Sequence, residues 1–484
     1  MNEKSKKLYI VGIILIVIGI LLIIFFKKEK NLNPTGNIRS IDYKSAYYMS
    51  GNDLQDFDLY FLNLEYDNNN IIYSPLSIKY ALQMLAEGAD GDTLEQINAV
   101  IGDYTTKKYT NSSHISLANA LFVKNDFKNA DVINKWVSDK TFGLIDNILS
   151  DDEISELDFG LLNALAIDMN WVNRLQASEY LSDDLSQIIY NVVYTHENYN
   201  DSIRMIDSIY NPTMTFNGKD NIESVEIGAT FNRYDIINEL GEDNIRNNIK
   251  KLYSTYLQEN TDDECKAVDE YVNEYINDID SNYNTGLSST DFYLYTDDSV
   301  KVFAKDLQEY DGTTLQYVGI MPIKENLSDY IQNTNSIKLS ALISKLKESK
   351  LENFKEGVIT KITGSLPLFS LDYGLNLMND LKTMGINDVF LLDKANLSKF
   401  TSAQDISIVK AAHKANIEFS NDGIKASAVT LFGGAGSARG GCGFDYKYDV
   451  PVEVVDITFD KPYMFIIRDK GSGEVWFTGA VYNP

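Results

Sequence analysis

The sequence predicts an α+β fold, and three observations support this prediction. Apolar residues at helical spacing dominate the chain between about residues 70 and 145, whereas strand-like runs fill most of it after residue 405. Helices and strands that are segregated along a chain in this way are typical of the α+β class. A hydrophobic fraction of 44% and an aromatic fraction of 12% supply a core, and 484 residues fit one large domain or two ordinary ones.

The N-terminal thirty residues differ from the rest of the chain. Residues 8–26 are apolar and uncharged, with lysines on both sides. A helix of this length, at about 1.5 Å per residue, nearly spans a hydrocarbon core of about 30 Å. The alternative is a cleaved signal peptide, but no small-residue cleavage pattern or lipid-accepting Cys follows. We expect a single-pass membrane anchor at 1–30, a linker at 31–37 and a domain at 38–484, placed outside the cell because long domains translocate readily.

Composition excludes several classes of function. The formal charge is −27, and six lysines among the first thirty residues make the remainder more acidic still. Nucleic-acid binding needs clustered Lys and Arg, so we expect no DNA or RNA partner. The three His lie far apart, and Cys265 and Cys442 have no C-x-x-C spacing, so we expect no metal site and no cofactor. The two Cys could form one distant disulfide or remain two free thiols.

The first predicted helices lie between residues 75 and 101. Ser74-Pro75 is typical of a helix start, and a second start follows at Gly91-Asp92. Each is followed by an apolar stripe at helical spacing. The stripes consist of Ile78, Leu82, Leu85 and Ala86, and then of Leu94, Ile97, Val100 and Ile101.

Two short apolar runs, 117–123 and 161–167, are typical of strands in a sheet that is covered on both faces. Between them, residues 133–145 predict a helix that ends at Gly143. From about 196 to 297 the chain becomes rich in Asn, Asp, Glu and Tyr, and we interpret this range as an acidic insertion. Two acidic amphipathic helices are expected within it, at 245–257 and 267–279.

Regular structure is predicted again from residue 300 onward. Residues 300–322 contain two β-rich runs joined by a Gly turn. Helical stretches are expected at 339–351 and 373–384. Strands are expected at 406–419, 452–459, 463–468 and 475–481.

Catalytic motifs are absent from the sequence. It contains no G-x-S-x-G elbow and no H-E-x-x-H helix, and His413 lies in an alternating run that is more typical of a structural, hydrogen-bonded histidine. The Gly-rich residues 433–443 precede a strand-like run instead of a helix, which argues against a phosphate-binding loop. We therefore expect that the chain is not an enzyme and that this segment is an exposed loop accessible to proteases.

Seven segments, in order along the chain, carry a family resemblance. They are 70–101 (NIIYSPLSIKYALQMLAEGADGDTLEQINAVI), 116–123 (SLANALFV), 162–171 (LNALAIDMNW), 366–369 (LPLF), 384–390, 408–415 (IVKAAHKA) and 460–484 (DKPYMFIIRDKGSGEVWFTGAVYNP). Together they resemble the serpins, protease inhibitors that trap a protease by inserting their own cleaved loop into a sheet. The resemblance covers residues 38–195 and 298–484 and implies helices packed on three β-sheets with an exposed reactive-centre loop.

The reactive loop implied by the resemblance covers about residues 420–451. Its hinge must slip between two strands, so small side chains and the absence of Pro favour insertion. The expected function is irreversible suicide-substrate trapping of a serine or cysteine endopeptidase by a monomer. The alternative is a non-inhibitory binding module that uses the acidic insertion. The hinge consists of Gly423, Ile424, Lys425, Ala426, Ser427, Ala428, Val429 and Thr430.

The resemblance also implies roles for residues outside the loop. Ser74, Ser77, Asn163 and His413 are similar to a polar cluster under the opening region of the sheet, where they would control opening. Trp171 is similar to a buried Trp near the place where insertion starts. The Asn-, Ile- and Lys-rich composition suggests a bacterial source.

The loop departs from the family pattern in two ways. Ile424 stands where inhibitory members usually have Thr or Ser, and its bulk is expected to slow the first step of insertion. The loop is also longer than the family's, which leaves the scissile bond open between Arg439-Gly440, for a trypsin-like protease, and Ser437-Ala438 or Ala438-Arg439, for an elastase- or subtilisin-like one. Cys442 in this loop is expected to be an exposed thiol, with redox control or capture of a thiol partner as its functional alternative.

Overall fold

The computed structural model divides the chain into two compact units, Met1–Ala46 and Tyr47–Pro484, and all described residues belong to the second. The expected membrane anchor and linker therefore lie outside the described residues. None of the described helices is long and apolar enough to cross a membrane. The structure describes residues 54–484 except 65–67, 103, 106, 108, 124–129, 144, 146–149, 153–158, 174, 176–211, 260–264, 278–290, 403–405, 425–443 and 445–450.

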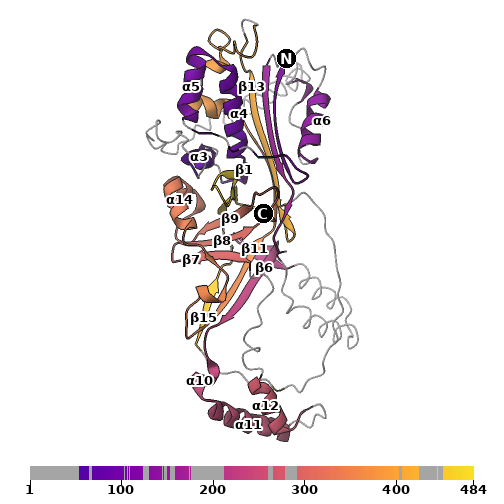
Figure 1. Cartoon of the computed structure of the whole chain (residues 1–484), viewed down its shortest axis with the longest axis vertical. Coiled ribbons are helices and arrows are strands. Elements are labelled where there is room, and N and C mark those ends of the chain that lie inside the picture. Colours follow the sequence, from indigo (N-terminus) through magenta and orange to yellow (C-terminus); the bar gives the residue numbers. More distant parts are fainter. Residues whose placement is uncertain are drawn as a thin grey trace, which may run out of the picture. The chain divides into compact units, whose positions relative to one another are not determined.

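Three β-sheets form the framework, as Figure 1 shows, and this confirms the predicted α+β class. The seven-stranded sheet has the order β1 (Ile71–Tyr73), β17 (Val475–Val481), β16 (Tyr463–Asp469), β9 (Leu315–Pro322), β8 (Val300–Asp306), β7 (Phe292–Thr296) and β10 (Lys347–Glu348). The four-stranded sheet has the order β15 (Val452–Asp456), β11 (Ile359–Pro367), β6 (Lys219–Asn232) and β5 (Thr213–Phe216). The six-stranded sheet has the order β2 (Ile115–Val123), β3 (Phe159–Ile167), β13 (Lys410–Phe419), β14 (Gly423–Ile424) and β4 (Met169–Asn170), and β12 (Phe369–Leu375) also pairs with β13.

Helices cover these sheets, and Figure 1 places α6 beside the long strands of the six-stranded sheet. The predicted start at Ser74-Pro75 is confirmed, because the Ser74 side chain accepts a hydrogen bond from the backbone N–H of Ser77. The α-helices are α3 (Asp56–Leu64), α4 (Pro75–Gly88), α5 (Gly91–Ile101), α6 (Ala130–Lys140), α10 (Ile236–Leu240), α11 (Glu242–Glu259), α12 (Val268–Asn277), α13 (Leu327–Asn333), α14 (Ser336–Ile343) and α15 (Leu377–Thr383). Short 3₁₀ turns occur at Leu351–Asn353 and Asp388–Phe390.

The predicted hairpin within residues 300–322 is confirmed. Asp311 and Gly312 both have positive φ, at 51° and 74°. Tyr310 and Thr313 exchange backbone hydrogen bonds of 3.0 and 2.9 Å across them. This pattern is that of a two-residue turn whose twist matches the twist of the flanking strands β8 and β9.

Three predicted helices have different limits in the structure. The helix predicted at 133–145 ends at Lys140, and Gly143, at φ +79°, closes the following turn by donating a hydrogen bond to Ser138 O. The helix predicted at 339–351 ends at Ile343, because Lys347 and Glu348 pair with strand β7. The first residues of the helix predicted at 373–384 belong instead to β12, where pairing with β13 overrides the helical spacing.

The range predicted as an insertion is too wide. Strands β5 and β6 lie within it, and β6 pairs with β11 from Ser224 to Asn232. Strand β7, at the end of the range, pairs with β8. In β6 the buried residues alternate with exposed polar ones, so its polar composition concealed a strand. Only α10, α11 and α12 are described elements of the range that lie outside the sheets.

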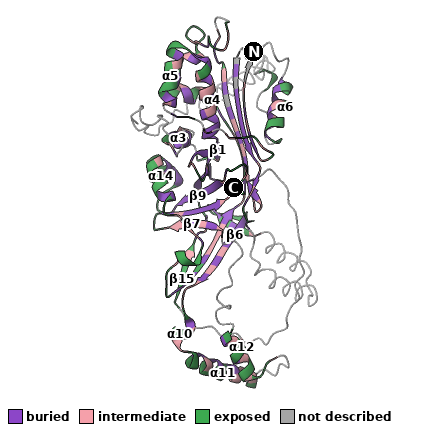
Figure 2. Cartoon of the chain, in the orientation of Figure 1, coloured by how far each residue is buried: buried purple, intermediate pink, exposed green. Residues whose placement is uncertain are grey.

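The main hydrophobic core lies between the sheets, where Figure 2 shows the strands as largely buried. Its centre is aromatic: Phe419 stacks on Phe369 at 5.3 Å and lies 4.9 Å from Tyr317, measured between ring centroids. Phe419 is the last residue of strand β13. Alternate residues of a strand share one face, and His413, Ala415 and Ile417 are buried like Phe419, so this face of β13 points to the core.

A buried charged cluster joins α3, α4 and the turn before β17. Lys79 Nζ lies 2.6 Å from Asp58 Oδ1 and 3.7 Å from Glu474 Oε1, and all three side chains are fully buried. The Tyr104 hydroxyl donates a hydrogen bond to Glu474. Burial raises the pKa of both Asp58 and Glu474, although Lys79 opposes the shift. The single ammonium therefore ties together chain segments that are nearly 400 residues apart.

Candidate functional site

The candidate site is a fork in the six-stranded sheet between β3 and β13. These parallel strands pair directly only along residues 160–163 and 410–413. Beyond His413 and Asn163, toward the C-terminal ends of β13 and β3, the two strands are not paired with each other. Farther along, β14 lies between β13 and β4, the short strand that follows β3, since Ile424 pairs with Phe419 on one side and with Met169 on the other.

The register between the two sides of the fork is the same where they pair directly and where β14 separates them. Lys410 is paired with Gly160 in the directly paired part, and Phe419 lies opposite Met169 across the intervening Ile424. In each of these two pairs the residue numbers differ by 250. Strands β3 and β13 therefore need to separate sideways, without sliding, to admit more residues between them.

The first two hinge residues already lie in the sheet. Gly423 is required there, because a Cβ atom on it would lie 2.2 Å from the carbonyl oxygen of Met169. Ile424 is 1% exposed and belongs to the main core. The Ile424 side chain already lies between two strands in this structure, and its expected effect on the rate of insertion stays a prediction.

Trp171 holds the bend that leads into β14. Its indole Nε1 donates a hydrogen bond of 2.9 Å to the carbonyl oxygen of Ser420, and its backbone N–H donates one of 3.0 Å to that of Asp422. Its ring packs against Phe419 and Tyr317 at centroid distances of 5.5 and 6.2 Å. The structure thus places Trp171 at the entrance of the loop into the sheet.

The four residues of the predicted polar cluster lie at the tip of the fork. The backbone N–H of Ser74 donates a hydrogen bond of 2.9 Å to His413 Nε2, and the side chain of Ser74 accepts from Ser77. Asn163 is the residue of β3 that faces His413 in the last direct pair. All four are at most 2% exposed. Deeper insertion must open the His413–Asn163 pair, next to which the start of α4 is bonded.

His413 is neutral at physiological pH. Burial lowers its pKa to about 3. Because Nε2 accepts the Ser74 N–H, the neutral ring carries its proton on Nδ1. Protonation of Nε2 would place its N–H against the backbone N–H of Ser74, so that two donors would face each other.

This pKa predicts a dependence of stability on pH. The unfolded His413 titrates near 6.5, so below that pH the unfolded chain binds a proton that the folded chain does not, and stability falls as the pH decreases. The free energy of unfolding should fall by about 2 to 3 kcal/mol more in the wild type than in His413→Gln between pH 7 and pH 4.5. Urea unfolding of both chains across this range tests this, and parallel curves would contradict the buried neutral imidazole.

The remaining predicted loop residues lie outside the described residues. These are Lys425, Ala426, Ser427, Ala428, Val429 and Thr430 of the hinge, and Ser437, Ala438, Arg439 and Gly440 around the candidate scissile bonds. Beyond them the structure describes Phe444 and Pro451, and Phe444 contacts aromatic residues of α11 and α12. Residue patterns did not identify this contact, although the tyrosine pairs at three- and four-residue spacing on these helices mark an aromatic face.

Cys265 is disulfide-bonded. Of the two alternatives that the sequence left open for this residue, the free thiol is therefore wrong. Among the described residues, no group of three or more His, Cys, Asp or Glu is placed to hold a metal ion.

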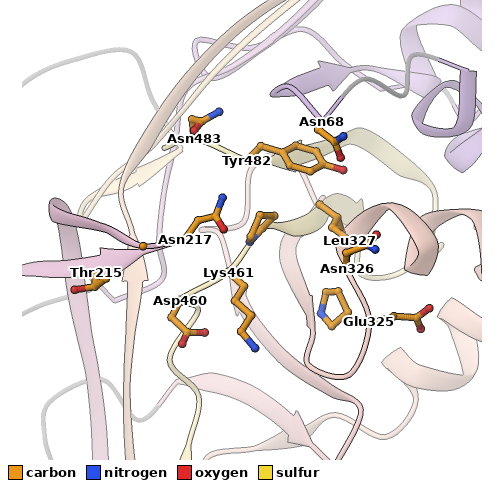
Figure 3. Close-up of a pocket in the computed structure, with 13 residues that line it drawn as sticks. Asn68, Thr215, Asn217, Glu325, Asn326, Leu327, Asp460, Lys461, Tyr482 and Asn483 are labelled. Atoms are coloured by element: carbon orange, nitrogen blue, oxygen red, sulfur yellow. The ribbon is translucent and has the colours of Figure 1, made fainter.

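A surface cavity of about 620 Å³ lies away from the fork (Figure 3). It opens between the β5–β6 turn, the segment before β16 and the C-terminal residues, and no predicted site residue lines it. Its wall is rich in amide groups, including those of Asn68, Asn217, Asn326 and Asn483.

Comparisons with known proteins agree with the architecture. A family model described as serpin (serine protease inhibitor) matches residues 56–118 and 270–484. Human leukocyte elastase inhibitor is 32% identical over 176 residues, which cover 36% of this chain and 42% of that protein, so the match spans less than half of its length. Mouse neuroserpin is 23% identical over 467 residues, covering 86% of this chain and 87% of that protein.

Two solved structures show the shared fold at low identity. The native state of the thermophilic serpin tengpin has a TM-score of 0.55 at 21% identity, covering 93% of this chain and 95% of that one. Thyroxine-binding globulin in complex with thyroxine has a TM-score of 0.54 at 15% identity, covering 91% of this chain and 98% of that one.

Proposed function

Because this chain belongs to the serpin family, we propose that it inhibits a serine or cysteine endopeptidase by irreversible suicide-substrate trapping. Serpins are protease inhibitors and not catalysts, so no catalytic residues are assigned. The observation that carries the proposal is the position of Ile424, paired with β13 on one side and β4 on the other. The start of the predicted loop thus lies between two strands, which is where trapping would insert the residues that follow it.

Trapping begins when the target protease attacks a loop carbonyl. Its Ser or Cys nucleophile forms an acyl-enzyme with the N-terminal part of the loop, and the new amine leaves with the C-terminal part. The candidate bonds are Ser437-Ala438, Ala438-Arg439 and Arg439-Gly440. Insertion of the acylated strand then drags the protease away from the cut before water can release it.

The register supports insertion of nine more residues, 425–433, alongside the ten residues of β13. Continuing the pairing from Ile424 and Phe419, Ala426 would face Ile417, Ala428 would face Ala415, and Thr430 would face His413. These three share the core face of Ile424, where small side chains and one hydroxyl fit. Strand alternation thus accounts for the Ala-rich hinge.

The polar cluster of Ser74, Ser77, Asn163 and His413 would slow insertion of the loop. His413 is bonded to Ser74 at the tip of the fork and pairs with Asn163 of β3, and this strand pair is lost if β3 and β13 separate without a replacement. Thr430, arriving opposite His413, supplies a hydroxyl at that position. Opening is therefore costly at first and favourable once insertion reaches residue 430.

We also propose that the domain works at a cell surface, anchored by residues 8–26. The disulfide at Cys265 supports an oxidising compartment, because disulfides persist outside the cytosol. The apolar run itself is the support for the anchor.

A second candidate is a non-inhibitory binding module. Thyroxine-binding globulin shares the fold and was solved in complex with thyroxine, and this chain carries the helices α10–α12 outside its sheets. Such a module would be cut by proteases without retaining them.

A panel of trypsin-like, elastase-like, subtilisin-like and papain-like proteases tests the proposal. The chain from Ile38 to Pro484 is mixed with each, and reducing, denaturing gels are combined with mass spectrometry of the released C-terminal peptide. We expect a denaturant-resistant adduct with one class, and the peptide mass identifies the scissile bond. Cleavage by every class without any adduct would contradict trapping and favour the binding module.

A further inference from the structure

Helices α11 and α12 form a small module with its own core. They pack against each other and against α10 through Ile236, Ile245, Ile249, Val272 and Ile276, which are all at most 6% exposed. Their other faces are largely exposed in Figure 2. The module is connected to the rest of the domain through β6, whose last residue is Asn232.

An aromatic cage on this module holds Phe444 of the reactive loop. The ring centroid of Phe444 lies 5.0 Å from that of Tyr253, 5.3 Å from that of Tyr256 and 5.6 Å from that of Tyr271. The Tyr271 hydroxyl donates a hydrogen bond of 3.1 Å to the backbone oxygen of Phe444. Ring contacts and a bond to the main chain thus fix one residue of the loop on helices that are 173 positions away in sequence.

The cage residues also contact one another within the module. Tyr253 is fully buried, stacks on Tyr271 at 4.1 Å and donates a hydrogen bond of 2.9 Å to the backbone oxygen of Lys266. This bond ties α11 to the segment that precedes α12. Two rings of the cage are therefore held in place by contacts that do not involve the loop.

A covalent link supports the same attachment. Cys265, three residues before α12, is disulfide-bonded, and the sequence contains only one other cysteine, Cys442. A bond within the chain would join the module to the loop two residues before Phe444. The ring contacts and the disulfide would then hold adjacent points of the loop.

We propose that α11 and α12 form a clamp on the C-terminal side of the reactive loop, which blocks complete insertion of the uncut loop and leaves insertion of the cut loop free. In this proposal the module of α11 and α12 binds the chain's own reactive loop, whether or not it also binds another protein. This inference rests on the proposed function for its purpose, but the attachment and its effect on the uncut chain can be measured separately.

Chain length explains the block. If residues 425–433 filled the slot beside β13, an inserted strand of about 30 Å would need a return path of the same length. With Phe444 held, only the ten residues 434–443 are available, and they span at most about 36 Å when fully extended, so the return path alone would use nearly all of them and leave little to reach the module. With the clamp released, the return path extends to β15 and gains eight residues, 444–451, for a span of up to about 65 Å.

Cleavage removes this restraint. Each candidate scissile bond lies between residues 437 and 440, on the N-terminal side of both Cys442 and Phe444. After cleavage the inserting strand needs no return path, and the clamp keeps only the C-terminal fragment. The clamp therefore opposes insertion of the intact loop before cleavage and does not oppose insertion of the cut strand, and hence trapping, after cleavage.

The test compares full-length Cys442→Ser/Phe444→Ala with the matched control Cys442→Ser/Leu252→Ala. Leu252 lies on α11 but is 45% exposed, so its removal spares the cage. Each uncut chain is incubated at 37 °C, and the fraction that becomes resistant to heat while keeping its intact mass is followed over time. We expect conversion to be about tenfold or more faster in the Phe444 variant than in the control.

Equal rates in the two chains, including no conversion in either, would overturn the clamp. Intact fresh samples are also titrated with the protease that forms the adduct, and both variants should trap it with the wild-type stoichiometry. Failure to trap by every chain, with faster conversion of the Phe444 variant, would reject the proposed inhibition and keep the clamp. If the double variant does not fold, Cys442→Ser/Tyr271→Phe removes the bond to the Phe444 backbone and leaves the rings, and the same rate comparison applies.

Discussion

Cutting the loop is expected to raise the midpoint of thermal unfolding by about 10 °C or more. The cut strand can extend β14 by nine residues, 425–433, each with neighbours on both sides, and at about 0.5–1.5 kcal/mol per net hydrogen bond the gain is on the order of 10 kcal/mol. A domain of this size unfolds with an entropy of about 2.1 cal/mol/K per residue, so this gain corresponds to a shift of about 10 °C before side-chain burial is counted. The uncut chain is therefore expected to be kinetically trapped above a more stable state.

Scanning calorimetry of intact and cut chains measures this shift. The cut is made by a protease that leaves no adduct, so that the whole sample is converted, and mass spectrometry verifies a single cleavage between residues 437 and 440. A chain cut elsewhere on its surface serves as the control for nicking itself. An unchanged midpoint after the loop cut would mean that the slot does not accept the strand, and would support the binding module.

Ala428→Asp is expected to turn the inhibitor into a substrate. If the inserted loop continues the register of Ile424, residue 428 would point to the core side and face Ala415, which is fully buried. A carboxylate in this place costs several kcal/mol, because no partner is available to it there. Insertion would stall after the cut, and water would release the protease first.

Ser427→Asp is the matched control, because in the same register residue 427 would point to the other side of the sheet and face the half-buried Asn416. Titration of a fixed amount of protease gives the moles of inhibitor consumed per mole trapped. We expect this ratio to rise from about one to above about ten for Ala428→Asp, and to stay near the wild-type value for Ser427→Asp. Equal ratios for the two variants would contradict insertion in this register.

Local signals in the sequence predicted much of the fold. Ser74-Pro75 and the turn at Gly312 act within a few residues, so the helix start and the hairpin were predicted correctly. Strand β6 was missed because its exposed face carries the same Asn, Asp and Glu that mark a loop, and only its pairing with β11 makes it a strand. The predicted helix limits near residues 347 and 375 were wrong for the same reason, because these residues pair with strands elsewhere in the chain.

The candidate site depended more on the resemblance than on residue patterns. Ser74 and His413 are 339 positions apart, and no spacing rule connects them, although family motifs named both. That Ile424 is already seated between two strands, and that Phe444 docks on α11 and α12, follows from contacts between distant segments. Such contacts depend on the whole fold, so neither was predicted.

The seven-stranded sheet sets a limit on when this chain can finish folding during synthesis. Among the described strands, β1 near the start of the domain pairs only with β17, which ends three residues before Pro484. At about 5–20 residues per second, a ribosome needs about 20–80 s to make the segment between them. Throughout that time β1 lacks its strand partner β17, and Lys79 lacks its partner Glu474. A variant truncated before β17 would leave β1, the first of the described strands, unpaired.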